Sequence, residues 1–471
     1  MVLALGLFAM GTRGMTDPDA WWHLRTGERI VTTLHVPHTD PYSYTRYGQP
    51  WVAHEWLSDV LIYSVYRLSG WPGLVVFFGL ITTATMLLLF ARCPGRPYIA
   101  GAVTAWAAIA SLPLWGVRPL MLSLLLASIF LVILERSDAH PNWLWWTPPL
   151  MLLWVNLHAE YALSLALLAL FLAGGVLDVA LGAETWAHAA PRLRNLGLVL
   201  AVCVALVPLN PNGVQMYVYP LRTLYSSAMQ QYIAEWASPN FHQGRFLPVL
   251  LLMLAILLGL GLAPRRMRPR EVLLLLVMTG AVLRSVRHIT IYVLVAAPIL
   301  AQLAQALLQE RERAWLTSAR ARAFPGKTLL NAGLLLAVAI FTLARVSYVL
   351  RHQADMEGES FPAAALAFLA AQKPPGPVLN HYNWGGYMIW KLYPEYRVYI
   401  DGRADLYGDA FMQRFAATYY LRPGWQQELE HWQIRTVVLP PAAPLVAALR
   451  AAPDWRRAYE DSQAVVLVRR P

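Results

Sequence analysis

Charged residues are scarce in this chain of 471 residues, where Asp, Glu, Lys and Arg make up 14% of the sequence. Soluble domains average about 25% charged residues, and the hydrophobic share here is 57%, which excludes an ordinary soluble protein. Cysteine is rarer still, with only Cys93 and Cys203. Neither belongs to a CxxC motif or to a set with metal-ligand spacing, which argues against a disulfide framework or a zinc site.

Long apolar runs dominate the sequence instead. A helix needs about 20 mostly apolar residues to cross a bilayer. The runs predict a polytopic α-helical membrane protein with about eleven membrane helices, at 1–15, 71–92, 97–116, 119–135, 142–158, 160–182, 194–210, 246–263, 271–286, 288–308 and 328–349. The first run is short and lacks the features of a signal peptide, so a truncated start and a short first helix both stay open.

The net charge of +11 is carried largely by short loops between the apolar runs, which makes nucleic-acid binding the weaker interpretation. Every second loop is basic, as in 265–270 and 311–327. Basic loops stay in the cytoplasm, so this alternation predicts a multi-pass protein of the cytoplasmic (inner) membrane. The other loops then face outward: 16–70, 116–118, 156–161, 210–245, 284–288 and the chain after about 350.

The chain changes character after residue 350. Strand-like runs PVLN, RVYID, TVVLP and AVVLVRR alternate with helical stretches, which is typical of an α/β domain. We therefore expect a transmembrane domain over 1–350 and an extracytoplasmic α/β domain over 351–471. In the first outward loop, apolar residues recur at helical spacing in 20–34 and 54–71, and they predict amphipathic helices that lie on the membrane.

Polar residues that can carry chemistry collect in or beside the outward loops. Asp17 and Asp19 follow the first apolar run, where a carboxylate can serve as a general base, a metal ligand or a helix N-cap. Asp19 has the stronger claim as a cap because a helical stretch follows it directly. Ionisable residues so near the hydrocarbon carry a desolvation cost and suggest function. The candidate set is Asp17, Asp19, His23, His54, Glu55, Arg118, His158, Glu160, Glu235, Arg284, Arg287 and His288.

Arginines in the outward loops run against the positive-inside bias and need another reason to be there. Arg118, Arg284 and Arg287 suit bidentate recognition of a phosphate. Snorkelling to the headgroups of membrane lipids is the competing interpretation. His54 and Glu55 also have a structural alternative, since they stand at the start of a predicted helix whose dipole favours an acid.

The stretch YIDGRADLYGD places Asp401, Arg403 and Asp405 after a predicted strand. Loops at strand ends often carry binding residues. Turn chemistry with an internal Arg–Asp pair is the favoured interpretation. NWGG at 383–386 lacks the lysine of a phosphate-binding P-loop and favours a turn that opens a helix.

Five motifs together carry a resemblance to a known family: DPDAWWHLRTGE, HEW before a helix, NLHAEY, AEWASPNF and NWGGYMIWKLYPEYRVYIDGRADLYG. With them the chain resembles bacterial integral-membrane glycosyltransferases of the GT-C superfamily, in the branch related to the mannosyl- and aminoarabinose-transferase (family 39-like) proteins. The resemblance covers almost the whole chain and identifies no substrate. The sequence departs from the family's frequent Asp-Glu pair with Asp-Pro-Asp, and the next outward loop is nearly bare apart from Arg118.

The resemblance implies that a sugar is moved from a polyprenyl-phosphate donor to an envelope acceptor, a lipid, glycan or protein, on the outer face of the membrane and with inversion. The base would be Asp17 or Asp19, with Glu160 as a further catalytic candidate. The rest of the candidate set is expected to bind substrate. A divalent metal, Mg²⁺ or Mn²⁺, held by Asp17, Asp19, His158 or Glu160 is an open alternative that the chemistry does not require.

Two other functions compete with transfer. A non-catalytic protein that binds lipid-linked glycans or assists envelope assembly is the first. A secondary transporter is the second, but transporters place ionisable residues near the middle of the bilayer, whereas here they cluster at one surface.

Overall fold

The computed structural model describes residues 1–315 and 327–471, with side chains described for 1–309 and 328–471. The predicted basic loop 311–327 lies outside the described side chains.

A helix stands where each apolar run predicts one. These helices are α1 (Val2–Gly11), α3 (Trp56–Arg92), α4 (Pro97–Ser111), α5 (Leu120–Arg136), α6 (Thr147–Leu157), α7 (Ala162–Ala180), α8 (Trp186–Leu206), α11 (Leu247–Leu262), α12 (Pro269–Arg284), α13 (Ile289–Trp315) and α14 (Lys327–Arg351). Within the described residues, seven helices are long and apolar enough to cross a membrane. The chain is a multi-pass membrane protein, and the count of eleven spans stays a prediction, since α1 has 10 residues and α6 has 11.

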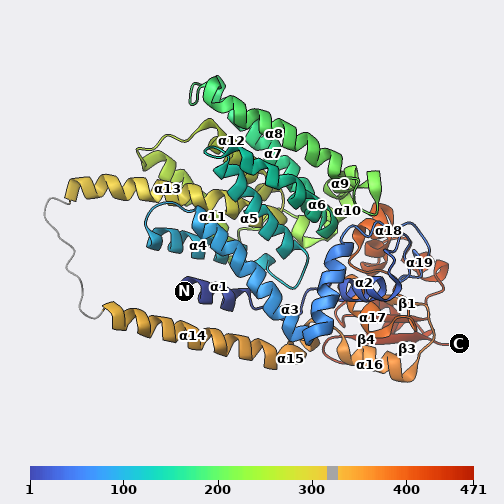
Figure 1. Cartoon of the computed structure of the whole chain (residues 1–471). Coiled ribbons are helices and arrows are strands. Elements are labelled where there is room, and N and C mark those ends of the chain that lie inside the picture. The colour runs from blue at the N-terminus through green and yellow to red at the C-terminus, as the bar shows by residue number, and fades with distance from the viewer. Residues whose placement is uncertain (316–326) are drawn as a thin grey trace.

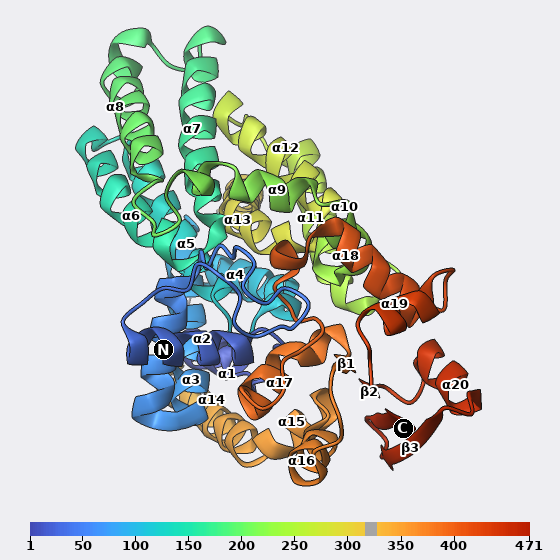
Figure 2. The ribbon, with the colours of Figure 1, turned by 90° about the vertical axis from the view of Figure 1, so that its right-hand side faces the viewer.

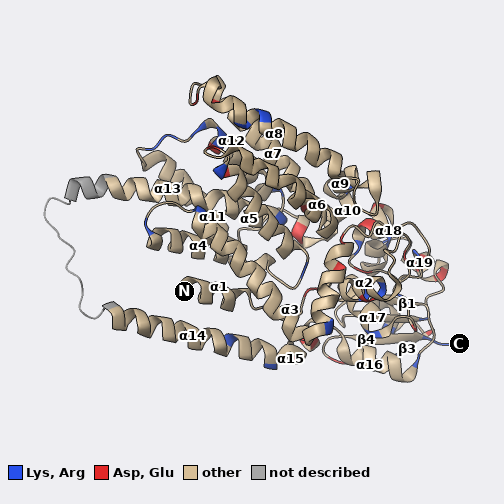
Figure 3. Cartoon of the chain, in the orientation of Figure 1, with Lys and Arg blue, Asp and Glu red and all other residues tan. Residues whose placement is uncertain are grey.

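The long helices lie side by side, and the C-terminal region sits at one end of them (Figure 1). Their flanks carry few charged residues between the two ends (Figure 3). Large apolar side chains such as Leu258, Leu276 and Phe341 are exposed on these flanks. Because a lipid tail is as apolar as these side chains, such flanks suit contact with the bilayer.

The helix α3 bends at Gly70, whose φ of 64° is a left-handed conformation that glycine tolerates. The bend separates the predicted helix 54–71 from the predicted span 71–92. The other predicted surface helix is α2 (Ala20–Thr33). It is packed between α3 and α17 (Gly385–Leu392) and buries Trp21, Trp22 and His23. Its place on a membrane surface stays a prediction.

Close packing of α2 on α3 depends on Gly27. A Cβ added there would lie 2.0 Å from the carbonyl oxygen of Asp59, so the two helix backbones are nearly in contact. This approach brings His23 of α2 to Asp59 of α3, with 2.5 Å between Nδ1 and Oδ1.

Short elements connect the long helices. They are η1 (Leu112–Leu114), η2 (Pro141–Trp146), η3 (Ala159–Tyr161), η7 (Val286–His288) and, in the predicted long outward loop 210–245, η4 (Gly213–Tyr217), α9 (Tyr219–Tyr225), α10 (Ser227–Tyr232), η5 (Ala234–Trp236) and η6 (Gly244–Phe246). The turned view shows α9 and α10 beside α18 (Ala404–Tyr419) of the C-terminal region (Figure 2). Asp409 joins them, because it accepts hydrogen bonds from the hydroxyls of Ser226 and Ser227.

The C-terminal region carries a four-stranded sheet with the strand order β1-β2-β4-β3. Its strands are β1 (Val378–Asn380), β2 (Thr436–Leu439), β3 (Trp455–Glu460) and β4 (Val465–Arg469). β1 is parallel to β2, and the other two pairs are antiparallel. The remaining helices are α15 (Gln353–Ser360), α16 (Ala363–Gln372), η8 (Tyr382–Trp384), α19 (Trp425–His431) and α20 (Pro444–Ala451). The helices and the sheet agree with the predicted α/β character.

One predicted strand of this region is wrong. RVYID (397–401) is no strand but forms a single bridge to the first outward loop, between Ser43 and Val398. The amide of Val398 donates to Tyr42 O, and the amide of Tyr44 donates to Val398 O. Tyr399 and Ile400 still pack in the core cluster that contains Leu379 and Val437 of the sheet, and the Tyr399 amide donates to Asn380 Oδ1 of β1. The true additional strand is β3, whose charged sequence WRRAYE gives no alternating apolar signal. A division of the chain at residue 350 stays a prediction.

Candidate active site

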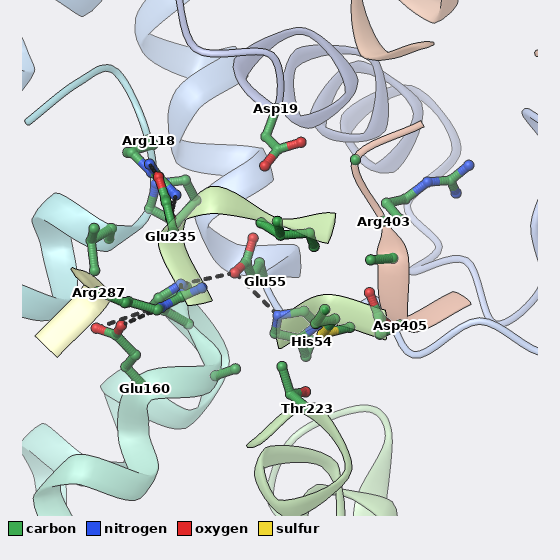
Figure 4. A pocket seen from close by; sticks show the side chains of 18 of the residues that line it. Asp19, His54, Glu55, Arg118, Glu160, Thr223, Glu235, Arg287, Arg403 and Asp405 are labelled. Atoms are coloured by element: carbon green, nitrogen blue, oxygen red, sulfur yellow. Dashed lines mark hydrogen bonds and ion pairs between the residues drawn. The ribbon is translucent and has the colours of Figure 1, made fainter. Parts of the chain in front are cut away.

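A cavity of about 640 Å³ lies where α2, the start of α3, η3, the 210–245 segment and the C-terminal region meet (Figure 4). Its lining includes eleven of the twelve predicted site residues: Asp17, Asp19, His23, His54, Glu55, Arg118, His158, Glu160, Glu235, Arg287 and His288. The twelfth, Arg284, is exposed at the end of α12 and does not line the cavity. Segments up to 270 residues apart in the sequence thus share one site, while the roles of their side chains stay predictions.

Arg118 joins two carboxylates on one side of the cavity. Its Nε lies 3.3 Å from Asp17 Oδ2, and its two terminal nitrogens donate to Glu235, with 3.0 Å from Nη2 to Oε2. Burial alone would lower the pKa of Arg118, but Asp17 and Glu235 raise it well above its ordinary value. Burial would likewise raise the pKa of Glu235, yet Arg118 lowers it to about 2. Arg118 and Glu235 are therefore both ionised at neutral pH.

Arg287 forms a second cationic group beside the first. Its Nε donates to Glu160 Oε1 at 2.8 Å, and its Nη2 lies 3.3 Å from His158 Nε2. The guanidinium also stands 5.3 Å from the centre of the Trp236 ring, a distance at which cations are attracted to aromatic faces. Two arginines with fixed geometry thus face one cavity, and His288 follows Arg287 in its lining.

Three imidazoles surround Glu55, and Figure 4 shows one of them, His54, beside it. Its carboxylate oxygens lie 3.3 Å from His23 Nε2, 3.1 Å from His54 Nε2 and 3.1 Å from His158 Nε2. Burial would raise the pKa of Glu55, but His54 and His158 hold it below its ordinary value. Glu55 is therefore an ionised carboxylate that three histidines hold in place, and it is a weak base.

Asp19 is the exception among the acids of the cavity. It occupies the N-cap position of α2, but its side chain makes no capping hydrogen bond, so the predicted cap role is wrong. Its carboxylate accepts a hydrogen bond from Trp22 Nε1 at 3.0 Å, and among the described residues it forms no ion pair with an arginine or lysine. Burial, followed by the charge of Asp17, raises the pKa of Asp19 to about 6. Asp17, in contrast, is paired with Arg118.

The C-terminal region supplies a wall of the cavity that the sequence did not predict as part of the site. Tyr382, Gly402 and Asp405 line it. The expected Arg–Asp pair is present, with 2.6 Å from Arg403 Nη2 to Asp401 Oδ2, but Asp405 turns toward the cavity instead of joining this pair (Figure 4). Burial raises the pKa of Asp405.

Two further lining residues, Tyr219 and Asp59, were also missed. The Tyr219 ring packs on the His54 ring with centroids 4.3 Å apart, and the tyrosine lies beside Asp405. The only sequence signals were a tyrosine in an outward loop and an acid early in a predicted helix. Neither signal separates a cavity residue from a surface residue.

The predicted metal ligands do not form a metal site in this structure. Among the described residues, no three His, Cys, Asp or Glu side chains converge in a way that could hold an ion. Asp17 faces Arg118 and Glu160 faces Arg287, while His158 Nδ1 lies 2.7 Å from the Ser123 hydroxyl. The donor atoms are thus directed at protein partners and not at a common point.

No protein-family model matches the sequence, and no curated protein matches it. Solved structures do match the fold. The oligosaccharyltransferase AglB of Archaeoglobus fulgidus, in complex with an inhibitory peptide and a dolichol-phosphate, has a TM-score of 0.57 and 12% identity, over 93% of this chain and 69% of that chain.

ArnT of Cupriavidus metallidurans matches over 99% of this chain and 96% of that chain. In its apo state the TM-score is 0.52 and the sequence identity is 16%. Bound to undecaprenyl phosphate, the TM-score is 0.50 and the identity is 15%. The fold is that of the GT-C membrane glycosyltransferases. The predicted fold is confirmed, and at these identities the likeness extends to the fold alone.

Proposed function

We propose that the chain is a membrane glycosyltransferase that moves a sugar from a polyprenyl-phosphate donor to an envelope acceptor, with inversion and with Asp19 as the base. The observation that carries the proposal is one cavity lined by two arginines, 15% and 18% exposed at their side chains, and by the carboxylate of Asp19, which pairs with no arginine or lysine among the described residues. The fold supports it, and so do the lipid phosphates that the ArnT and AglB structures contain.

Arg118 and Arg287 are proposed to bind the donor phosphate. A polyprenyl phosphate that leaves carries negative charge, so it needs charge stabilisation more than a proton. Guanidinium groups bind phosphate oxygens in a bidentate manner, and Glu235 and Glu160 hold these two in place before the substrate arrives. Apolar lining residues such as Leu124, Leu163 and Ile291 suit the prenyl chain next to the phosphate.

The reaction follows from this arrangement. A hydroxyl or amine of the acceptor attacks the anomeric carbon from the face opposite the phosphate, and the new bond forms as the carbon–oxygen bond to phosphate breaks. The polyprenyl phosphate leaves with the electron pair, and Asp19 takes the acceptor's proton. One displacement inverts the anomeric centre. A base with a pKa of about 6 is mostly ionised at neutral pH and still accepts a proton effectively.

The acceptor is proposed to enter on the side of Asp405, Tyr219 and Tyr382. These residues line the cavity, and Asp405 has no arginine or lysine in ion-pair contact among the described residues. Carboxylate and phenol oxygens can bind the hydroxyl or amine groups of an acceptor. The outer face of the cytoplasmic membrane is the proposed location, because the loop charges predict that the site faces outward.

The test is donor consumption by the purified chain in lipid nanodiscs. Polyprenyl-phosphate sugars extracted from the host's own membranes serve as donors, with acceptor supplied as an envelope extract, and mass spectrometry follows donor loss and polyprenyl phosphate release. We expect turnover by the wild type and by Asp17→Asn, and none above background by Asp19→Asn. If the chain binds donors but consumes none of them, the non-catalytic alternative is correct.

A further inference from the structure

A second cavity, of about 580 Å³, lies among α5, α7, α12 and α13, away from the candidate active site. The helix α5 lines the first cavity with Leu120 and the second with Glu135, roughly 20 Å further along the helix. Among the described residues, the two cavities share no lining residue. Basic residues before and on α12 lie at the end of the bundle that points away from the C-terminal region (Figure 3). The second cavity is therefore on the side whose loops are predicted to be cytoplasmic.

Three arginines share a single carboxylate in the lining, that of Asp138. Its Oδ1 accepts hydrogen bonds from Arg192 Nη1 at 2.6 Å and from Arg270 Nη1 at 2.8 Å. Its Oδ2 accepts from Arg270 Nη2 at 2.6 Å and from Arg268 Nη1 at 3.4 Å. A carboxylate has about four lone-pair sites, so Asp138 has no capacity for a further donor.

Arg268 and Arg265 keep N–H donors that these acids do not take up. A guanidinium has about five N–H donors, and among the described residues Arg268 uses one of them, on Asp138. Its side chain lines the cavity and is 56% exposed. Arg265 directs only Nη2 to Glu271, whose Oε2 also accepts from the Arg268 amide. The acceptors around the cavity are thus occupied before the arginine donors are, which suits the cavity to an anion.

Arg270 is fixed without any ligand. The helices α7 and α12 approach so closely that a Cβ added to Gly174 would lie 2.7 Å from Arg270 Cγ. The guanidinium stands 5.4 Å from the centre of the Phe171 ring, and the side chain is 8% exposed. Arg270 and Asp138 therefore form a rigid base of the cavity, and the exposed Arg268 is the arginine that can turn to a ligand.

The lining is apolar where the cavity continues between the long helices, at Leu131, Phe171, Leu274 and Ile299. Beside it, Leu276 of α12 is 67% exposed, as expected for a flank that meets lipid tails. A free phosphate ion gains nothing from apolar walls. A phospholipid matches both parts, because its phosphate lies at the headgroup level and its acyl chains run along the helices. Basic pockets between membrane helices on the cytoplasmic side are known to bind anionic headgroups.

We propose that this second cavity binds the phosphate headgroup of an anionic membrane phospholipid, with Arg268 and Arg265 as the donors to the phosphate oxygens. The proposal goes beyond the proposed sugar transfer and does not depend on it. The predicted cytoplasmic position agrees with it, since anionic lipids give that leaflet its negative surface potential. Inorganic phosphate would be recognised by the same donors, so the experiment separates the two sources.

The experiment is native mass spectrometry of the full chain in detergent, titrated with lipid to give a dissociation constant. The probes are phosphatidylglycerol, whose headgroup is anionic, and phosphatidylcholine with the same acyl chains, which has no net charge. We expect phosphatidylglycerol to bind more tightly than phosphatidylcholine. Arg268→Gln should weaken its binding about fivefold, and Arg265→Gln combined with Arg268→Gln about 25-fold, at the usual contribution of an arginine near an anionic headgroup.

A matched control comes from α8. Arg194 is exposed, lies on the same predicted side of the membrane and is outside the cavity lining, so Arg194→Gln removes the same charge and should leave the dissociation constant unchanged. Inorganic phosphate in excess is the third probe and should not displace the bound phosphatidylglycerol. Thermal unfolding checks each variant. If the double variant fails to fold, Arg268→Gln decides, because Arg268 makes only one side-chain hydrogen bond among the described residues.

Several results overturn the proposal. Wild-type affinity in the folded Arg268→Gln protein means that the phosphate does not sit at this arginine. An equal loss in Arg194→Gln, or equal affinity for phosphatidylcholine, means that the lipid is held by general attraction. Displacement by inorganic phosphate assigns the cavity to a free anion. None of these results bears on donor consumption, so the proposed function stands or fails by its own test.

Discussion

Replacement of Arg287 by glutamine tests the proposed phosphate site most selectively. The substitution removes the charge that pairs with Glu160 and lies 5.3 Å from the centre of the Trp236 ring, and it keeps a polar side chain. A hydrogen bond to a charged group contributes about 1.5–3 kcal/mol. Since about 1.4 kcal/mol is a tenfold change in affinity, Arg287→Gln should weaken the binding of undecaprenyl phosphate about 10- to 100-fold.

Two variants serve as matched comparisons. Arg284 lies three residues earlier and outside the cavity lining, so Arg284→Gln loses the same charge and should leave the dissociation constant unchanged. Glu160→Gln frees Arg287 from its carboxylate and removes a negative charge near the phosphate, so binding should stay equal or tighten. The assay is microscale thermophoresis of detergent-purified protein against undecaprenyl phosphate at fixed salt, with thermal unfolding as the check on folding.

Two results of this binding assay would contradict the proposed phosphate site. If Arg287→Gln binds undecaprenyl phosphate as tightly as the wild type, the phosphate does not sit at this arginine. If Arg284→Gln weakens binding as much as Arg287→Gln, the effect is general attraction of an anion and not a built site.

Three further predictions concern the base and the metal. Asp19→Asn should lower kcat by about 10²–10⁴, the usual contribution of a general base, with the dissociation constant for undecaprenyl phosphate unchanged; equal turnover by the mutant contradicts the assignment. Because Asp19 must be ionised to accept a proton, kcat/KM should fall tenfold per pH unit below about 6. Trp22→Phe should move this acidic limb to higher pH, since the Trp22 hydrogen bond lowers the pKa of Asp19. Turnover should survive EDTA, because among the described residues no three possible ligands converge and the carboxylates of Asp17 and Glu160 are directed at arginines. Loss of turnover that Mg²⁺ or Mn²⁺ restores would contradict this.

The sequence alone predicts the features of the fold that depend on short-range patterns. Apolar runs predicted the positions of the long helices because a bilayer demands about 20 such residues in succession. The alternation of basic loops predicts that Asp17, Glu160 and Arg287 lie on the same side of the membrane. Most of the candidate set lines one cavity for that reason.

What the sequence could not supply depends on contacts across hundreds of residues. Gly402 and Asp405 belong to the cavity because the C-terminal region packs on the first outward loop, through the ion pair of Arg403 with Asp40 and the bridge between Ser43 and Val398. RVYID has the composition of a strand, but its backbone pairs with that same loop. Asp19 stands at the start of a helix, where the sequence predicts an N-cap. Its carboxylate instead accepts a hydrogen bond from Trp22 and lies against Gly402.

The most direct test of the central claim is complementation of a deletion strain. Mass spectrometry of the envelope glycans compares the parent strain with the deletion strain carrying the wild-type chain, Asp17→Asn or Asp19→Asn. The account predicts that one sugar substituent is lost on deletion, restored by the wild type and at least in part by Asp17→Asn, and absent with Asp19→Asn expressed at the same level. Restoration by Asp19→Asn to the wild-type amount would contradict it.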